Sequence, residues 1–280
     1  MQFKDKFLQL SEPQVMGILN VTPDSFSDGG AFNQFDSALR QVQRMLEDGA
    51  AFIDIGGEST RPGAQDVSVQ QELDRVIPVI EAIKQRFDTI VSIDTSKAEV
   101  MTAAVNAGAG LINDVRALQE NGALDAAAQL DVPVCLMHMQ GQPRTMQHAP
   151  HYHDVVAEVM DFLRQRVDAC LHAGIKKTHL MIDPGFGFGK NLQHNFQLLA
   201  SLASFHQLHL PLLVGMSRKR MIGELLHREV DQRLAGSITA ATLAAQQGAQ
   251  IIRVHDVRET VDALQVLRMM NAYKEDKNER

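Results

Sequence analysis

The sequence predicts an α/β protein in which eight βα units close into a parallel barrel. Short apolar runs recur at intervals of roughly 30 residues, the spacing of one barrel unit. Each run ends in a polar residue and a loop, and a helix-type apolar pattern follows. The runs do not alternate with polar residues, as expected of strands buried on both faces. A doubly wound open sheet is the alternative, but no Gly-x-Gly-x-x-Gly pattern opens the first helix.

The chain therefore has a predicted strand and helix for each unit. Strands are expected at residues 15–20, 51–56, 90–94, 111–115, 132–138, 180–183, 212–215 and 251–254. Helices are expected from about residue 36, from 68 and from 96, at 123–130, 154–173, 196–202 and 236–247, and from 256, with a further helical region after 220. We expect one (β/α)8 or TIM barrel domain over residues 1–280, with a short N-terminal segment and a frayed tail from Lys274.

Local signals set the predicted helix ends. The first helix ends at Gly49, and the second begins at Ser68, whose capping box is completed by Gln71. Pro78 falls inside the second helix, so we expect a kink or a break there.

Two further helix starts are predicted in the same way. Ser96 with Glu99 resembles another capping box, and Asp256 with Glu259 is expected to cap the last helix.

Composition limits the possible partners. The net charge of −7 argues against broad binding to nucleic acid or to an anionic membrane. No apolar run is long enough to span a bilayer, and the N-terminus lacks a secretory signal. Cys135 and Cys170 give no disulfide framework, and each is predicted to be a small core residue. We expect a cytoplasmic protein that binds small molecules.

The strand ends carry the candidate chemistry. In a parallel barrel, residues at the carboxyl ends of different strands meet on one face. The polar and basic residues placed there are Asn20, Thr60, Arg61, Asp94, Asn113, Asp183, Lys219, Arg253 and His255. The carboxylates and Asn113 suit the donors of a flat nitrogen heterocycle. Asn20, Arg61, Arg253 and His255 suit a pyrophosphate or metal-phosphate group.

The stretch at 180–190 is central to this prediction. Its apolar run delivers Asp183 to an open edge, where Gly185, Gly187 and Gly189 free the backbone. An isolated Asp-Pro-Gly more often forms a simple turn. The repetition of the same pattern along the chain favours a site.

Histidines in the 138–153 loop are weaker candidates. His138, His148, His151 and His153 lack the paired spacing of a zinc site, so we do not expect a metal there.

Five segments resemble the bacterial dihydropteroate synthase family. They are NVTPDSFSDGG at 20–30, GGESTRPG at 56–63, DPGFGFGK at 183–190, SRK at 217–219 and RVHD at 253–256. The resemblance extends over essentially the whole chain. It departs in details, such as Ala98, where the family often has proline, and the histidine-rich loop at 148–153.

This resemblance implies a reaction and roles for the residues. The family joins dihydropterin pyrophosphate to p-aminobenzoate with Mg²⁺, releases pyrophosphate and serves folate synthesis. The pterin site would comprise Asp94, Asn113, Met137, Asp183, Lys219 and Arg253. The p-aminobenzoate site would comprise Phe26, Thr60, Arg61, Pro62, Phe188 and Ser217. Asn20, Thr60, Arg253 and His255 would bind pyrophosphate, and Asn20 also the metal. The catalytic set would be Asp94, Lys219, Arg253 and His255, and the resemblance also suggests a homodimer.

The residue types are consistent with a dissociative substitution. An aromatic amine is unprotonated at neutral pH, so departure of pyrophosphate is the harder step, and cations would stabilise it. The loops at 21–35 and 57–67 are expected to close over the site. The alternatives are a pterin-binding methyltransferase barrel, which releases no pyrophosphate, a Schiff-base aldolase with Lys219 as nucleophile and, least expected, a non-catalytic binding module.

Overall fold

Eight parallel strands form a closed barrel in the computed structural model, which describes residues 1–22, 31–59, 66–141, 146 and 149–278. The strand order is β8-β7-β6-β5-β4-β3-β10-β9. A parallel bridge between Ile182 and Leu212 joins the two ends of that order, so the sheet closes on itself. The predicted barrel is confirmed, and the open sheet is excluded.

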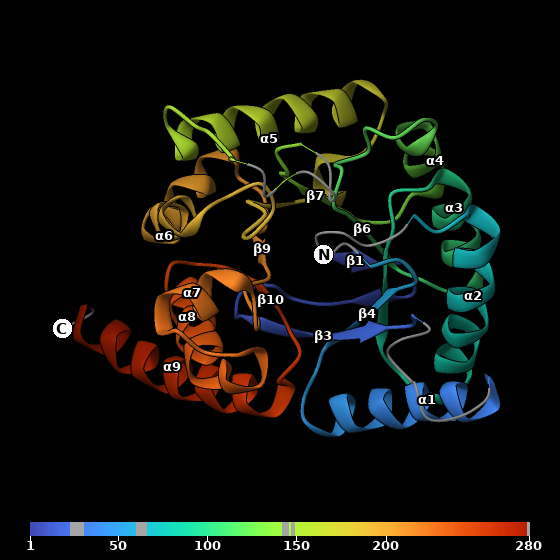
Figure 1. The fold of residues 1–280 in the computed structure, drawn as a ribbon, viewed down its shortest axis with the longest axis horizontal. Coiled ribbons are helices and arrows are strands. Elements are labelled where there is room, and N and C mark those ends of the chain that lie inside the picture. Colours follow the sequence, from blue (N-terminus) through green and yellow to red (C-terminus); the bar gives the residue numbers. More distant parts are fainter. Residues whose placement is uncertain (23–30, 60–65, 142–145, 147–148, 279–280) are drawn as a thin grey trace.

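Helices surround the strands (Figure 1). The strands are β3 (Gln14–Asn20), β4 (Phe52–Gly56), β5 (Ile90–Asp94), β6 (Leu111–Asp114), β7 (Val134–Met137), β8 (Leu180–Asp183), β9 (Leu213–Val214) and β10 (Ile251–Val254). The helices are α1 (Ala31–Glu47), α2 (Val69–Arg86), α3 (Ala98–Ala107), α4 (Ala123–Leu130), α5 (Val155–His172), α6 (Leu192–Ala200), α7 (Arg220–Leu226), α8 (Leu234–Gln246) and α9 (Val257–Asn278).

The core has two parts that follow from the strand pleat. The larger part packs between the strands and the surrounding helices. A separate cluster fills the inside of the barrel and takes one residue from each strand: Met16, Phe52, Ile90, Leu111, Cys135, Met181, Leu213 and Ile251. Side chains alternate along a strand, so residues two and four positions further on also face the interior. Apolar residues thus fill the amino end of the barrel, and polar residues fill its carboxyl end.

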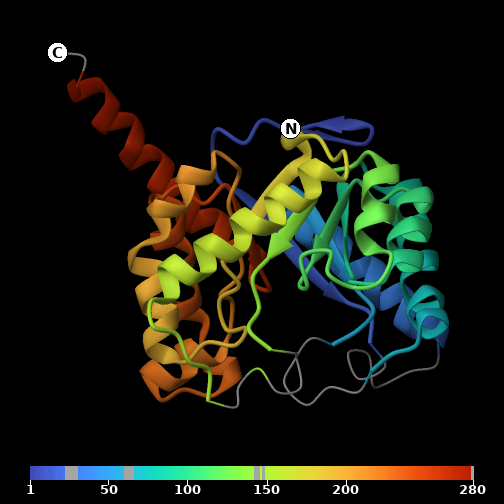
Figure 2. The same cartoon turned by 90° about the horizontal axis from the view of Figure 1, so that it is seen from above.

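A short hairpin covers the amino end. It consists of β1 (Gln2–Phe3) and β2 (Lys6–Phe7), which pair antiparallel. Phe3 is 1% exposed, belongs to the interior cluster and meets Phe52 edge-on at 5.0 Å between ring centroids. Figure 2 shows the hairpin at the opposite end of the barrel from the carboxyl ends of the strands. The short N-terminal segment was expected, but its role as a plug was not.

The helix signals gave mixed results. The capping box of Ser68 and Gln71 is present. The expected interruption at Pro78 was wrong in part, because α2 runs continuously from Val69 to Arg86. The capping box at Ser96 is wrong: α3 follows Lys97 without a side-chain cap, and the Ser96 hydroxyl instead donates to Asp114.

The last helix is longer than expected. α9 continues to Asn278, through residues that we expected to fray, and Figure 2 shows its end extending away from the barrel. None of the helices in the described ranges is long and apolar enough to cross a membrane.

Candidate active site

Strand register brings the predicted polar residues to one level. Asn20 lies opposite Gly56, Gly56 opposite Asp94, and Asp94 opposite Asn113. On the other side of the barrel Met137 lies opposite Asp183. These residues follow the inward-facing apolar cluster by two or four positions. The carboxyl end of the barrel therefore has a polar interior made by the residues that the sequence singled out.

Arg253 connects two of the inward-facing polar side chains, and a third joins them through Asp54. Its Nε donates to Asp54 Oδ2 at 2.6 Å, and its second guanidinium nitrogen donates to Asp94 Oδ2 at 2.8 Å. Asn113 Nδ2 donates to the same Asp54 oxygen at 3.1 Å. The predicted pyrophosphate contact of Arg253 would thus compete with its bonds to two carboxylates.

Asp54 is a site residue that sequence reasoning missed. It is fully buried, and its Oδ1 has no hydrogen-bond partner within the described part of the chain. The signal was present in the sequence: one carboxylate interrupts the apolar run at 51–56, two residues before Gly56.

Burial dominates the titration of this cluster. It raises the pKa of Asp94 to about 7, although the Arg253 guanidinium opposes the shift. For Arg253, burial acts to lower the pKa, but the carboxylates of Asp54 and Asp94 outweigh it and raise the pKa above its ordinary value. Arg253 therefore stays charged, whereas the Asp94 carboxyl group has a pKa close to neutral pH.

Asp183 and Lys219 form the second charged part of the site. Burial raises the pKa of Asp183, while the nearby Lys219 ammonium opposes this. Burial lowers the pKa of Lys219 to about 8 despite Asp183. Lys219 Nζ donates to the Phe186 carbonyl at 2.6 Å and lies 4.5 Å from the centroid of the Phe188 ring. The predicted pterin and p-aminobenzoate residues thus meet at Lys219.

Asp183 also shapes the loop that follows it. Its Oδ1 accepts a hydrogen bond from the Gly185 amide at 2.7 Å. Gly185 has a φ of +71°, and a β-carbon there would lie 1.8 Å from the His138 carbonyl oxygen. The turn at Asp183 is therefore present, and the site role of Asp183 stays a prediction. A residue with a β-carbon does not fit at position 185.

Lys190 holds the loop that follows Asp183 through bonds to its backbone carbonyls. Its Nζ is buried and donates to the carbonyls of Gly185 and Phe188 at 2.9 and 3.0 Å, and it lies 2.8 Å from His138 Nδ1. Burial, reinforced by Lys190, lowers the pKa of His138 to about 2, so its ring is neutral and accepts the hydrogen bond. The described residues contain no group of three or more His, Cys, Asp or Glu that could hold a metal.

Ser217 and His255 are paired at the ends of neighbouring strands. The Ser217 hydroxyl lies 3.0 Å from His255 Nδ1 and accepts from the His255 amide at 3.1 Å. Between Ser217 and Lys219, Arg218 takes a left-handed conformation with a φ of 57°. Its side chain is held by Asp256, with a 3.0 Å bond from Nε. This ion pair helps to fix the strained residue and so orients its two neighbours.

A cavity of about 310 Å³ lies beside His255, between α1 and the start of α9. Arg40 and Arg44 line it together with His255. These two arginines were not predicted. They bring two positive charges to the cavity beside the histidine, and Asp48 brings one negative charge.

Asn20 lies close to Asp94. A β-carbon on Gly56 would be 3.8 Å from Asn20 Oδ1 and 3.7 Å from Asp94 Oδ2. Other predicted residues, Phe26, Thr60, Arg61 and Pro62, and also His148, lie outside the described residues.

Comparisons with known proteins agree with this arrangement. The profile of a family described as "Pterin binding enzyme" matches residues 16–255. Dihydropteroate synthase of Escherichia coli (strain K12) is 59% identical over 270 residues, 96% of this chain and 96% of that protein.

Solved structures are similar over the same length. The Yersinia pestis dihydropteroate synthase, in a complex with a sulfonamide drug, has a TM-score of 0.93 and 60% identity over 97% of this chain and 99% of that one. The Xanthomonas albilineans enzyme, in complex with 7,8-dihydropteroate, has a TM-score of 0.87 and 55% identity over 95% and 96% of the two chains.

Proposed function

The chain belongs to the dihydropteroate synthase family of pterin-binding transferases, and we propose that it performs the family's condensation by a dissociative substitution at the pterin methylene. The products are dihydropteroate and pyrophosphate. The observation that carries the proposal is the ring of inward-facing polar residues at the carboxyl end of the barrel. It unites two acidic positions, Asp94 and Asp183, with the cations Lys219 and Arg253.

The pterin occupies the interior of this ring. Asp183 accepts N–H bonds from the aminopyrimidine edge, and Asp94 and Asn113 contact other polar ring atoms. Lys219 donates to a ring acceptor, while Met137 and Arg253 pack against the ring. Arg253 is anchored for this role by Asp54 and Asp94.

The proposed reaction exchanges two bonds at one carbon. The bond between the methylene carbon and the pyrophosphate oxygen breaks, and its electron pair leaves with the pyrophosphate. The amine nitrogen of p-aminobenzoate then forms a bond to that carbon and gives up a proton. His255 and Arg253 stabilise charge on the leaving group, and the Asp94 carboxylate stabilises positive charge that develops on the pterin.

p-Aminobenzoate lies on the outer side of the pterin in this proposal. Phe188 and Ser217 form the described part of its site, and Phe26, Thr60, Arg61 and Pro62 form the rest. The sulfonamide bound by the Yersinia pestis relative leads us to expect that sulfonamides compete with p-aminobenzoate here.

Mg²⁺ is the proposed cofactor, and the residues present fit it. Asn20 offers an amide oxygen near the Asp94 carboxylate, and Mg²⁺ usually takes only one or two protein oxygens together with substrate phosphates. When bound, the ion neutralises charge on the pyrophosphate. Asn20→Ala should weaken Mg²⁺ binding to the enzyme–pyrophosphate complex, as measured by calorimetry.

We also propose a cytoplasmic homodimer. Free, buried Cys135 and Cys170 suit a reducing compartment. Support for a second copy comes from exposed apolar side chains on and between α7, α8 and α9: Leu225, Leu226, Val230, Leu234, Leu243 and Val266. Light scattering on the purified protein tests it.

A pyrophosphate-release assay tests the activity. Release should require both dihydropterin pyrophosphate and p-aminobenzoate, and it should stop with EDTA and return with added Mg²⁺. Release that does not depend on the amine would exclude the condensation. A covalent adduct trapped on Lys219 by borohydride would favour the aldolase alternative instead.

A further inference from the structure

The glycine-rich loop at 185–189 contacts Lys219 through three consecutive residues. The Phe186 carbonyl accepts a hydrogen bond from Lys219 Nζ at 2.6 Å. A β-carbon at Gly187 would lie 3.1 Å from Lys219 Cδ, so the loop backbone packs against the stem of the lysine there. The centroid of the Phe188 ring lies 4.5 Å from Lys219 Nζ. The loop therefore determines where the Lys219 ammonium points.

Lys190 holds the backbone of this loop at two places. Its Nζ donates to the carbonyls of Gly185 and Phe188 at 2.9 and 3.0 Å, and these two residues enclose the part of the loop that packs on Lys219. Nζ also lies 2.8 Å from His138 Nδ1. The whole residue is only 2% exposed. One buried nitrogen thus ties together the two ends of the stretch that touches Lys219.

Two other side chains fix the rest of the loop. The Tyr152 hydroxyl donates to the Gly189 carbonyl at 2.8 Å. Asn195 accepts from the Gly187 amide at 2.7 Å and donates to the Lys190 carbonyl at 3.2 Å. Gly187 and Gly189 have φ values of +81° and +62°. Glycines have the greatest conformational freedom of any residue, so the shape of this loop depends on these hydrogen bonds.

Stability alone is a poor reason for a lysine at position 190. The described hydrogen-bond partners of its Nζ are carbonyls and an imidazole, not a carboxylate. Burial lowers the pKa of Lys190 well below its ordinary value, although the Asp183 carboxylate opposes the shift. Burying an ammonium without a directly paired anion costs stability. A need for one loop conformation beside the site accounts for that cost.

We infer that Lys190 is a positioning residue for Lys219, acting through the backbone of the loop at 185–188. Without the Lys190 side chain, two loop carbonyls lose their donor, and the loop no longer keeps the conformation that fixes the Lys219 ammonium. The ammonium then takes up other orientations, and fewer of them suit an acceptor on the pterin ring. This inference rests on the proposed function, in which Lys219 donates to the pterin.

A double-mutant cycle tests this route. Binding of 6-hydroxymethylpterin is measured by calorimetry at neutral pH, below the pKa of about 8 that burial gives Lys219. Lys190→Met should weaken binding about tenfold or more, the effect of losing a hydrogen bond from a charged donor. In a Lys219→Met background the same change should weaken binding less than about twofold, because the ammonium that Lys190 positions is already gone.

Lys190→Gln is the second variant at this position. Its amide can still donate to a loop carbonyl, so its affinity for the pterin should lie between those of the wild type and Lys190→Met. If neither variant folds, Lys190 serves the fold alone and the inference fails.

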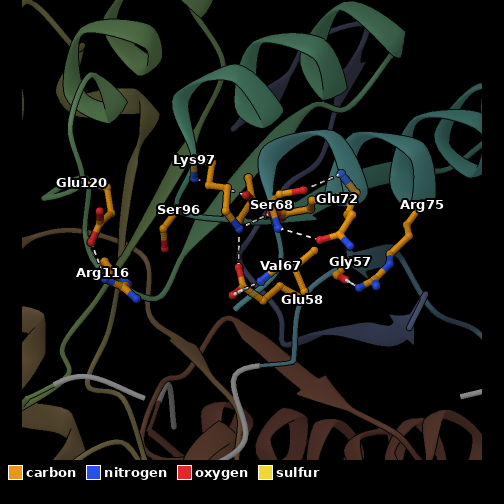
Figure 3. Close-up of polar contacts among 12 residues, drawn as sticks. Gly57, Glu58, Val67, Ser68, Glu72, Arg75, Ser96, Lys97, Arg116 and Glu120 are labelled. Atoms are coloured by element: carbon orange, nitrogen blue, oxygen red, sulfur yellow. Dashed lines mark hydrogen bonds and ion pairs between the residues drawn. The ribbon is translucent and has the colours of Figure 1, made fainter. Parts of the chain in front are cut away.

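Lys97→Met is the matched control (Figure 3). Lys97 is also a partly buried lysine at the carboxyl end of the barrel, and it pairs with Glu58 and with Glu72, the latter at 2.5 Å. It follows β5, which lies across the closed barrel from β9, the strand before Lys219. Lys97→Met should lower the melting temperature. Its effect on pterin affinity should be the same with Lys219 and with Lys219→Met, because the two sites are independent.

Two further results would overturn the inference. One is binding of the pterin by Lys190→Met at wild-type strength. The other is a loss of affinity that persists in full in the Lys219→Met background, which assigns the effect of Lys190 to Asp183 or to the fold at large. A wild-type protein that does not bind the pterin would instead overturn the proposed function, so the two failures are distinguishable.

Discussion

At the scale of single residues, Asp183 is the clearest test of the pterin site. Asp183→Asn should weaken binding of a pterin analogue by about 2–5 kcal/mol, because an amide cannot accept two N–H bonds and presents a donor to a donor. The Gly185 amide, which donates to the present carboxylate, can still donate to the asparagine oxygen. Calorimetry checks this, and an unchanged affinity would remove Asp183 from the site.

Lys219 should set the alkaline limb of pterin binding. Its pKa is lowered to about 8, so the ligand-free enzyme loses the ammonium donor as pH rises through that value. Affinity for a pterin analogue should then fall by up to about tenfold per pH unit. Lys219→Arg should lack this limb, since arginine stays charged. A limb that persists in the arginine variant belongs to the ligand or to another group.

The lowered pKa of Lys219 also affects stability: as pH rises, pterin affinity should fall, but the free energy of unfolding should increase. Between about pH 8 and the ordinary lysine value near 10.4, the unfolded chain holds a proton that the folded chain has lost. The contribution of Lys219 to the free energy of unfolding therefore rises with pH across this window and is lost as pH falls through about 8.

His255 and Arg253 should respond differently to truncation. Arg253→Ala leaves the fully buried Asp54 carboxylate and the largely buried Asp94 carboxylate without their cation, and it should destabilise the fold by about 3–5 kcal/mol. His255→Ala should lower kcat by about two orders of magnitude with little change in melting temperature. Measuring kcat and the melting temperature of both variants tests this difference. A normal kcat for His255→Ala would refute its role at the leaving group.

At the scale of elements, the N-terminal hairpin should matter for stability and not for catalysis. Phe3→Ala should cost about 3–5 kcal/mol, because it empties a fully buried site beside Phe52. Phe7→Ala is the control in the same hairpin: Phe7 is 71% exposed, so its loss should cost within about 0.5 kcal/mol. Denaturant titration measures the free energy of unfolding of both variants. Equal losses would contradict the role of Phe3 in closing the amino end of the barrel.

The sequence predicted the strands well because each is an apolar run ended by a polar residue. β5 and β10 have the predicted bounds, 90–94 and 251–254. Helix starts were harder, because Ser96 has two possible partners, the backbone of α3 and the Asp114 carboxylate. That competition is decided by tertiary packing, which a local pattern does not contain.

The hairpin and Asp54 were missed for related reasons. Each strand of the hairpin has only two residues, too few for a periodic pattern. Asp54 has its partners 59 and 199 positions away, at Asn113 and Arg253. Asp54 interrupts an apolar strand pattern, but only the closed barrel shows what it pairs with.

At the scale of the whole molecule, the two substrates should bind in order. Phe188 is in contact with Lys219, which in turn interacts with Asp183, so the described part of the proposed amine site adjoins the proposed pterin site. The affinity for p-aminobenzoate should rise at least about tenfold once pterin, Mg²⁺ and pyrophosphate are present. Calorimetry with and without these ligands measures the gain, and equal affinities would show a preformed amine site.

The hairpin at the amino end of the barrel limits the direction from which substrates can reach the proposed site. Phe3 and the apolar interior cluster fill the amino end of the barrel, so we expect substrates to reach the proposed site from the carboxyl end. In the proposed site the pterin lies deeper than p-aminobenzoate, so an amine that binds first should hinder entry of the pterin. The pterin substrate should therefore bind before p-aminobenzoate, and the product, which carries the pterin ring, should be the last molecule to leave.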